Sequence, residues 1–430
     1  MTLLPGKLRR FRFNLPQRIA AALLALFLAQ GLWLTGHQTL TDRDYQYARC
    51  GREMWERPSP LTGYFTSCGN IRDGILAYRL AGLPLTLDLF GERVLDHFRK
   101  PEDKVVQAGA PADRSSPAGW ETGAPADRSS PAGWEADGQL STWELRHQMT
   151  HVLLLMRMPF LMAGCMLGAG LWWVTRRLYG DLGGYTALAL YCFSPAILKA
   201  CATPNPEVLA ALGVYGGVYT CIGVAHAMQG PRSKWRPRIV LLTAAFGLAA
   251  SSHIAALPVV ALLGLVLMLW VAEGSRSQVL PVALGAVAGA MVLVFACYGF
   301  SPDAFSYLFR SAAGFLWFSL DPAHRFFSTL ANAGITVASA AAAVLFLSLR
   351  KSWYFGNTTP LLCFLVIVAL VMTGAPGSPW LWALPFLFTF VGGVFADACE
   401  GPRGRVAMGA VGAIVLLQAV FCVLSLPGLL

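Results

Sequence analysis

The sequence predicts an all-α membrane protein with about eleven transmembrane helices, within a range of 10 to 13. Of its 430 residues, 56% are hydrophobic and only 13% are charged, against roughly 25% charged in an ordinary soluble domain. The apolar residues also run in stretches of about 20, the length of helix that spans ~30 Å of hydrocarbon. This composition argues against a soluble enzyme, and it favours topology over nucleic-acid binding as the reason for the net charge of +10.

The first predicted helix covers residues 19–36 and follows a basic stretch, residues 1–18, that holds no acidic residue. We expect this stretch to be cytoplasmic, because Lys and Arg beside a span mark its cytoplasmic side. The alternative is a cleaved signal peptide. The residues after Trp33 lack a small-x-small cleavage pattern, so an uncleaved anchor is favoured.

Residues 37–150 are predicted to form one large periplasmic loop. The stretches TDRDYQYARCGREMWE and IRDGILAYRLAGLPLTLDLFGERVLDHF place apolar and aromatic residues at helical spacing among charges. That pattern is typical of helices that lie in the membrane surface. The sequence GAPADRSSPAGWE then occurs at 109–121 and again at 123–135. Its composition cannot bury a core and predicts a flexible surface segment.

The rest of the chain, residues 151–430, is predicted to hold the remaining spans, near 152–174, 184–202, 207–228, 239–252, 254–272, 279–299, 333–349, 361–374, 382–398 and 408–428. When the spans alternate, most basic residues fall in cytoplasmic connections, namely Arg176, Arg177, Arg232, Lys234, Arg236, Arg238, Arg276, Arg350, Lys351, Arg403 and Arg405. The short connections on the other side hold Lys199, Arg310 and Arg325. This asymmetry predicts a single orientation in a bacterial inner membrane. A re-entrant hairpin around His253 is the alternative to two short crossings there.

The ten cysteines do not show the spacing of a metal site, and CxxC and HExxH motifs are absent, so no metal ligand is assigned. Most cysteines fall in or beside predicted spans, where they behave as small core residues. Only Cys50 and Cys68 lie in the predicted periplasmic loop. In an oxidising periplasm these two can form a disulfide, or they can stay free.

Ionisable residues kept at the outer membrane edge are candidates for function, because charge near lipid is costly. Asp42 and Asp44 directly follow the first span and could supply a general base or bind a cation, or they could simply begin a solvated loop.

Pro195, Pro204 and Pro206 break the helix near residues 194–208. This outer turn carries Lys199 and Glu207, whose ordinary explanation is a snorkelling Lys and an interfacial Glu.

Three further candidates are weaker. Arg72 and Arg79 are seven residues apart, so they share a helical face and could bind a phosphate or lipid headgroups. Asp73 lies beside Arg72, and His253 lies between two short apolar runs, where a satisfied buried histidine is the usual explanation.

The order of motifs along the chain is also informative. Arg157 and Pro159 open a span, Arg176 to Gly180 form a basic and aromatic turn, Ser194 and Pro195 end the next span, and Glu207 follows in an outer turn. The late segment GSPWLWALPFLFTFVGG adds a span with a Leu-Pro core. In this order the chain resembles the GT-C glycosyltransferases, above all the bacterial relatives of protein O-mannosyltransferases and of the aminoarabinose transferase that modifies lipid A.

The resemblance implies transfer of a sugar from a polyprenyl-phosphate donor to a lipid, glycan or protein acceptor at the periplasmic face. The family's catalytic acid maps onto Asp44, with Asp42 beside it and Glu207 as the second acid. Cations that would neutralise the leaving phosphate are Arg72, Arg79, Lys199 and Arg310. No cofactor is required by this chemistry, although a divalent cation is a candidate.

The chain also departs from the family pattern. Asp-Arg-Asp stands where the family often has Asp-Glu, TSCGNIRDG stands where it often has His-Pro-Pro, and the second acid is Glu rather than Asp. These departures keep a non-catalytic homologue open. A transporter or flippase of a lipid-linked intermediate is the other alternative, but that class usually shows inverted repeats and midplane charges, which the sequence lacks.

Overall fold

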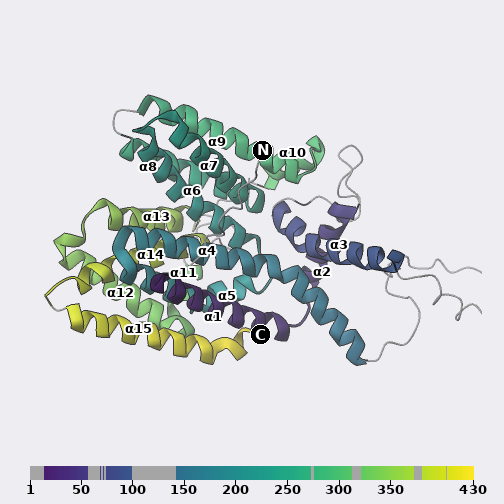
Figure 1. Cartoon of the computed structure of the whole chain (residues 1–430), viewed down its shortest axis with the longest axis horizontal. Helices are drawn as coiled ribbons and strands as arrows, with labels where there is room; N and C mark the ends of the chain where they lie inside the picture. The colour runs from purple at the N-terminus through teal and green to yellow at the C-terminus, as the bar shows by residue number, and fades with distance from the viewer. Residues whose placement is uncertain are drawn as a thin grey trace, which may run out of the picture.

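The computed structural model describes residues 14–56, 68, 71, 74–98, 142–272, 276–311, 321–371, 380–402 and 404–430. Every regular element in these ranges is helical (Figure 1). The α-helices are α1 (Leu15–His37), α2 (Asp42–Glu56), α3 (Ile75–Phe98), α4 (Thr142–Cys192), α5 (Pro195–Cys201), α6 (Pro206–Met228), α7 (Arg232–Ser252), α8 (Ala256–Val271), α9 (Arg276–Cys297), α10 (Pro302–Ser311), α11 (Asp321–Ser328), α12 (Ala333–Ser348), α13 (Phe355–Val371), α14 (Trp380–Cys399) and α15 (Gly404–Ser425). The tandem repeat at 109–121 and 123–135 lies outside the described residues.

Seven helices in these ranges are long and apolar enough to cross a membrane. They cover Leu15–His37, Thr150–Cys192, Pro206–Ala227, Arg276–Cys297, Leu330–Ser348, Trp380–Cys399 and Gly404–Leu429. Two shorter apolar helices, Ala256–Val271 and Phe355–Leu370, add to them. The protein is therefore an all-helical membrane protein, while the count of eleven crossings stays a prediction.

Helix α4 is a hairpin of two antiparallel legs. Gly180 interrupts it with a φ of 76° and a ψ of −172°, a conformation that only glycine adopts without strain. On either side of Gly180, a Cβ on Gly184 would lie 3.0 Å from the Cβ of Arg176. Further along, the Tyr191 hydroxyl donates to the Gly164 carbonyl at 2.6 Å. The two legs match the spans predicted at 152–174 and 184–202, but the second leg ends at Cys192 and α5 restarts at Pro195, since proline is favoured at the first position of a helix.

The bundle has two groups of helices that meet at α4 and α14. Helices α6, α7, α8 and α9 pack on one another, and α12, α13, α14 and α15 form the other group (Figure 1). Helix α14 is the central element, since its side chains are buried almost without interruption from Trp380 to Ala396. Helix α15 covers the outside, and only Val411, Gln418 and Cys422 are buried along it.

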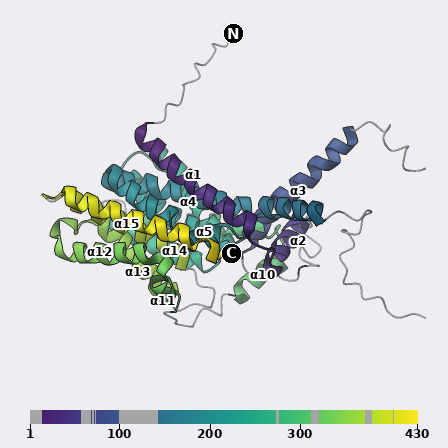
Figure 2. The same ribbon diagram turned by 90° about the horizontal axis from the view of Figure 1, so that it is seen from below.

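The C-terminus lies beside the end of α1 rather than its start (Figure 2). The Gln38 side-chain amide, just after α1, donates to the Leu429 carbonyl at 3.3 Å. The opposite end of the bundle carries the pair of Lys351 and Glu400, joined at 2.9 Å.

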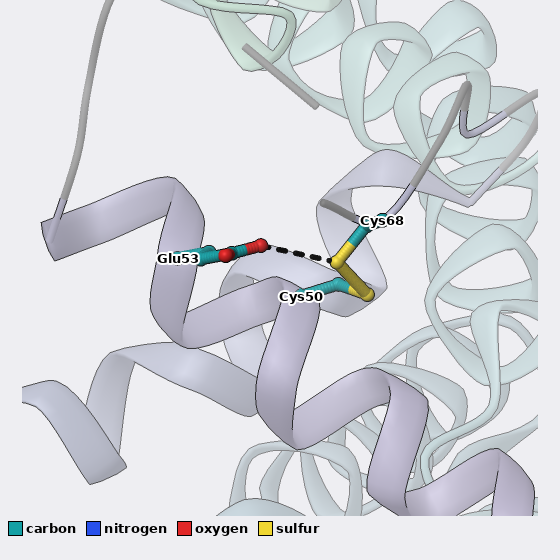
Figure 3. Close-up of a disulfide and its surroundings, with 3 residues drawn as sticks. All are labelled: Cys50, Glu53 and Cys68. Carbon is teal, nitrogen blue, oxygen red and sulfur yellow. Dashed lines mark hydrogen bonds between the residues drawn. A yellow bond between two sulfur atoms is a disulfide. The ribbon is translucent and has the colours of Figure 1, made fainter. Parts of the chain in front are cut away.

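Helices α2 and α3 form a separate hairpin at one end of the bundle (Figures 1 and 2). They cross where Gly51 meets Gly82 with no room for a side chain on either, and the Tyr47 and Tyr78 rings stack at 4.1 Å. A disulfide joins Cys50 of α2 to Cys68 (Figure 3). The placement of these helices on a membrane surface stays a prediction.

Candidate functional site

Asp44 and Arg157 form a buried ion pair where α1, α2 and α4 meet. The Asp44 side chain is 2% exposed and that of Arg157 is 1% exposed, and Arg157 donates to Asp44 Oδ2 at 2.7 Å. The same oxygen accepts from the backbone N–H and the hydroxyl of Thr41, at 3.0 and 2.9 Å. The Thr41 hydroxyl also accepts from the Asp44 N–H at 3.2 Å, so the two residues cap the start of α2.

Arg157 completes the junction by donating to the Thr35 and Thr39 carbonyls, each at 3.3 Å. Those carbonyls belong to the end of α1 and the link to α2. One guanidinium thus ties three segments together, and its charge is balanced by Asp44. In this arrangement the Asp44 carboxylate is buried, is engaged by Arg157 and Thr41, and ties the start of α2 to α4.

Asp42 and Arg43, by contrast, are exposed in the first turn of α2. The Arg43 guanidinium lies over the Tyr47 ring, 5.7 Å from its centroid. The part of the Arg43 side chain that packs against the protein loses solvation, which works against its charge, but the attraction of Tyr47, Tyr78 and Glu207 outweighs this loss and raises the pKa of Arg43. The charge of Glu207, at the start of α6, therefore reaches Arg43.

Glu207, at the start of α6, lies next to His253, at the end of α7. Their Oε1 and Nε2 atoms are 3.8 Å apart, and the two side chains are 12% and 15% exposed. The Asn205 side chain accepts from the Glu207 N–H at 3.1 Å and caps α6. The His253 ring meets Trp382 of α14 edge to face at 5.2 Å between centroids. Residues from the start of α6, the end of α7 and α14 thus meet at one site.

Tyr47 of α2 and Tyr78 of α3 stack on each other beside Arg43. Burial, with a further contribution from Tyr78, raises the pKa of Tyr47 to about 12 despite the opposing effect of Arg43. Burial likewise raises the pKa of Tyr78. Both hydroxyls therefore stay protonated near neutral pH and can donate hydrogen bonds.

Arg79 is held away from this cluster by other contacts. Its Nε donates to the Cys297 carbonyl at the end of α9, at 2.6 Å. Its guanidinium lies over the Trp55 ring at 5.2 Å, and the Trp55 indole donates to the Arg79 carbonyl. The first of these contacts joins α3 to the end of α9, and the other two join α3 to α2.

The remaining predicted cations are only partly located. Lys199 is exposed in the last turn of α5. Arg72 and Asp73 lie outside the described residues, and Arg310 is in α10 with its side chain likewise undescribed. In the described part of the chain, no three His, Cys, Asp or Glu side chains are grouped so as to hold a metal ion.

The structure thus places Glu207 beside His253, within electrostatic reach of Arg43, and turns Asp44 inward. Arg43 and Trp382 had no assigned role in the sequence, and Tyr47 and Tyr78 were noted only as part of amphipathic helices. A small apolar cavity, large enough for about one water, is lined by Leu167, Tyr191, Ile197, Cys201, Val208, Ala211 and Leu381. Val208 and Leu381 are the sequence neighbours of Glu207 and Trp382.

Comparisons with known proteins leave the family open. No protein-family profile matches the chain, and no curated protein matches its sequence. Among solved structures, the fold is similar to the Archaeoglobus fulgidus oligosaccharyltransferase in the apo form, with a TM-score of 0.48 and 10% sequence identity. The match covers 96% of this chain and 56% of that one, so the chain spans little more than half the length of that protein.

Proposed function

We propose that the protein is a membrane glycosyltransferase that moves a sugar from a polyprenyl-phosphate donor to an acceptor at the periplasmic face of a bacterial inner membrane. The proposal includes eleven crossings, with the α2–α3 hairpin on the periplasmic side. The observation that carries it is the pair of Glu207 and His253, 3.8 Å apart and within electrostatic reach of Arg43, where this hairpin packs against the ends of α6 and α7. A cation, a carboxylate and an imidazole at one end of the bundle suit the phosphate of a lipid-linked sugar.

The chemistry assigns one task to each group. An acceptor hydroxyl attacks the anomeric carbon of the sugar, and the bond between that carbon and the phosphate oxygen breaks. Glu207 or Asp42 takes the hydroxyl proton as general base. Arg43 and Lys199 balance the charge of the departing polyprenyl phosphate. Because a phosphate leaves readily, the reaction needs no general acid, and Asp44 supports the site by holding the start of α2.

The engagement of Asp44 with Arg157 favours one second candidate, a GT-C homologue that binds a lipid-linked sugar without transferring it. In this candidate the same site binds the lipid-linked sugar, but no sugar is transferred. It predicts binding of polyprenyl phosphate by a protein that releases no product from any donor.

The test uses the full chain in lipid nanodiscs with a panel of radiolabelled polyprenyl-phosphate sugars and membrane-extracted acceptors. We expect transfer from at least one donor, and an Arg43→Gln variant should raise the KM for that donor by about tenfold, from ~1.4 kcal/mol of lost phosphate interaction. The matched control is Arg49→Gln, an exposed arginine on the same helix. Equal KM values for Arg43→Gln and wild type would remove Arg43 from the donor site. Binding of undecaprenyl phosphate without any transfer would favour the second candidate.

A further inference from the structure

The disulfide between Cys50 and Cys68 ties α2 to the chain that leads into α3 (Figure 3). Cys50 is buried on α2, one turn after Tyr47. Cys68 comes shortly before Ile71 and Gly74, which precede α3. A covalent link at Cys68 therefore restrains the chain at the point where it approaches the bundle.

Gly74 contacts the two helix ends that carry Glu207 and His253, and Ile71 contacts the chain just after α9. The Ile71 carbonyl accepts from the Tyr298 hydroxyl at 3.4 Å, just after α9. A Cβ on Gly74 would lie 3.3 Å from the Cβ of Pro206 and 3.6 Å from the Ser252 carbonyl oxygen. Pro206 immediately precedes Glu207, and Ser252 immediately precedes His253. We call these interactions the Gly74 contact.

Gly74 is well suited to this close approach. Its φ of +75° is in the left-handed region, which other residues adopt at a cost. Its carbonyl accepts from the Ala77 and Tyr78 N–H groups, at 2.9 and 3.4 Å, in the first turn of α3. Movement of Gly74 would therefore alter the start of α3 as well as the ends of α6 and α7.

The α2–α3 hairpin does not depend on the disulfide alone. The crossing of Gly51 and Gly82 and the stacking of Tyr47 on Tyr78 hold the two helices together further along. Loss of the disulfide should leave these contacts in place. What it removes is the restraint on the 18-residue separation between Cys50 and Cys68, and with it the tether of the Gly74 contact.

We infer that Cys50 and Cys68 are positioning residues whose disulfide seats the Gly74 contact and thereby fixes Glu207 relative to His253. This inference rests on the proposed function only for its effect on transfer. Without the disulfide, the chain before α3 would leave the ends of α6 and α7. The two ionisable groups would then lose their fixed geometry, whereas the helices that carry them would remain folded.

The first arm of the test measures amide hydrogen exchange and needs no substrate. The full chain in nanodiscs is compared with the Cys50→Ser/Cys68→Ser double variant and with Cys399→Ser, a half-buried free cysteine near the end of α14. We expect exchange at Ala77 and Tyr78 to be at least about tenfold faster in the double variant alone, with α14 unchanged. Unchanged exchange at Ala77 and Tyr78 would overturn the inference.

The same arm can be run without mutation. Dithiothreitol donates two electrons and two protons to the folded protein, so that both cysteines become thiols and the reagent becomes a cyclic disulfide. Faster exchange should follow, and reoxidation should restore it. This protocol keeps the test decisive if the double variant fails to fold.

The second arm separates positioning from binding. We expect the kcat for sugar transfer to fall by about tenfold in the double variant, since small displacements of reacting groups are costly. The Kd for undecaprenyl phosphate should stay within about twofold, because Arg43 lies on the unaffected part of α2. Faster exchange with an unchanged kcat would refute the positioning role. If the wild-type protein transfers no sugar, the proposed function has failed. The amide hydrogen exchange of the first arm then tests by itself whether the disulfide holds the Gly74 contact in place.

Discussion

The buried pair of Asp44 and Arg157 predicts that Asp44→Asn destabilises the protein before it affects chemistry. The substitution keeps the shape of the side chain but removes the charge that balances Arg157, whose guanidinium is 1% exposed. Removing one partner of a buried ion pair costs about 3–5 kcal/mol, since the other charge is left uncompensated. Asparagine can still accept one hydrogen bond through Oδ1, so the lower half of that range applies, about 3 kcal/mol.

Two further variants define the effect. Asp42→Asn changes an exposed carboxylate two residues away and should alter stability by no more than about 0.5 kcal/mol. Asp44→Leu/Arg157→Met removes both charges together and should recover most of the loss, because apolar replacement of a buried pair is often neutral. The double variant therefore separates the cost of a lone charge from the loss of packing.

The assay is equilibrium unfolding in mixed micelles of lipid and detergent, followed by tryptophan fluorescence, with sugar transfer measured on the same preparations. We expect Asp44→Asn to lower the free energy of unfolding by about 3 kcal/mol and the double variant by about 1 kcal/mol. An Asp44→Asn protein as stable as wild type but inactive would refute this reasoning. Asp44 would then act on the substrate directly, as the family resemblance implies.

Three other predictions concern separate parts of the fold. Gly180→Ala should destabilise the α4 hairpin by about 1–3 kcal/mol, because a residue with a side chain is strained at a φ of 76° and a ψ of −172°. Gly170→Ala, at a position with open space around it, should leave the stability unchanged. Equal unfolding curves for the two variants would contradict this prediction. Gln418→Leu should lower the free energy of unfolding by about 3 kcal/mol in the same assay, because the fully buried amide hydrogen-bonds to the backbone of Phe193, Ala331 and Ile335 and so joins α15 to two other segments. Gln46→Leu, on the surface, is the control. A loss below about 1 kcal/mol would show that water replaces the amide. Glu53→Gln should speed reduction of the disulfide by an anionic thiolate about fivefold, because the Glu53 carboxylate lies 3.3 Å from the Cys68 sulfur (Figure 3) and repels the attacking charge by ~1 kcal/mol. A neutral phosphine should reduce the variant and the wild type at the same rate. A fivefold gain with the phosphine as well would show that Glu53 acts by blocking access.

The helices were the part of the fold most open to prediction from the sequence. Apolar length and the placement of breaks are local properties, so the α4 hairpin could be placed from its two apolar runs and the intervening Gly180. The break at Pro195 shows the limit of the same reasoning. A short helix after Ser194 continues the apolar run that the sequence presents as one span.

The site could be predicted only in outline. Glu207 and His253 stood out as ionisable residues between apolar runs, but their proximity depends on the packing of α6 against α7. The partner of Asp44 lies 113 residues away in Arg157, which no local pattern connects to it. Arg43 was visible between two acids, yet the influence of the Glu207 charge on it depends on tertiary packing. Long-range contacts of this kind are set by tertiary packing, which composition and periodicity do not encode.

The most direct test of the central claim is sugar transfer by Glu207→Gln in nanodiscs, compared with Asp303→Asn, an exposed carboxylate in α10. If Glu207 belongs to the catalytic site, its variant should lose about 100-fold or more in kcat with its stability retained, in line with the loss of a general base. The control should keep the wild-type rate. Wild-type transfer by Glu207→Gln would contradict the assignment of this end of the bundle as the site of sugar transfer.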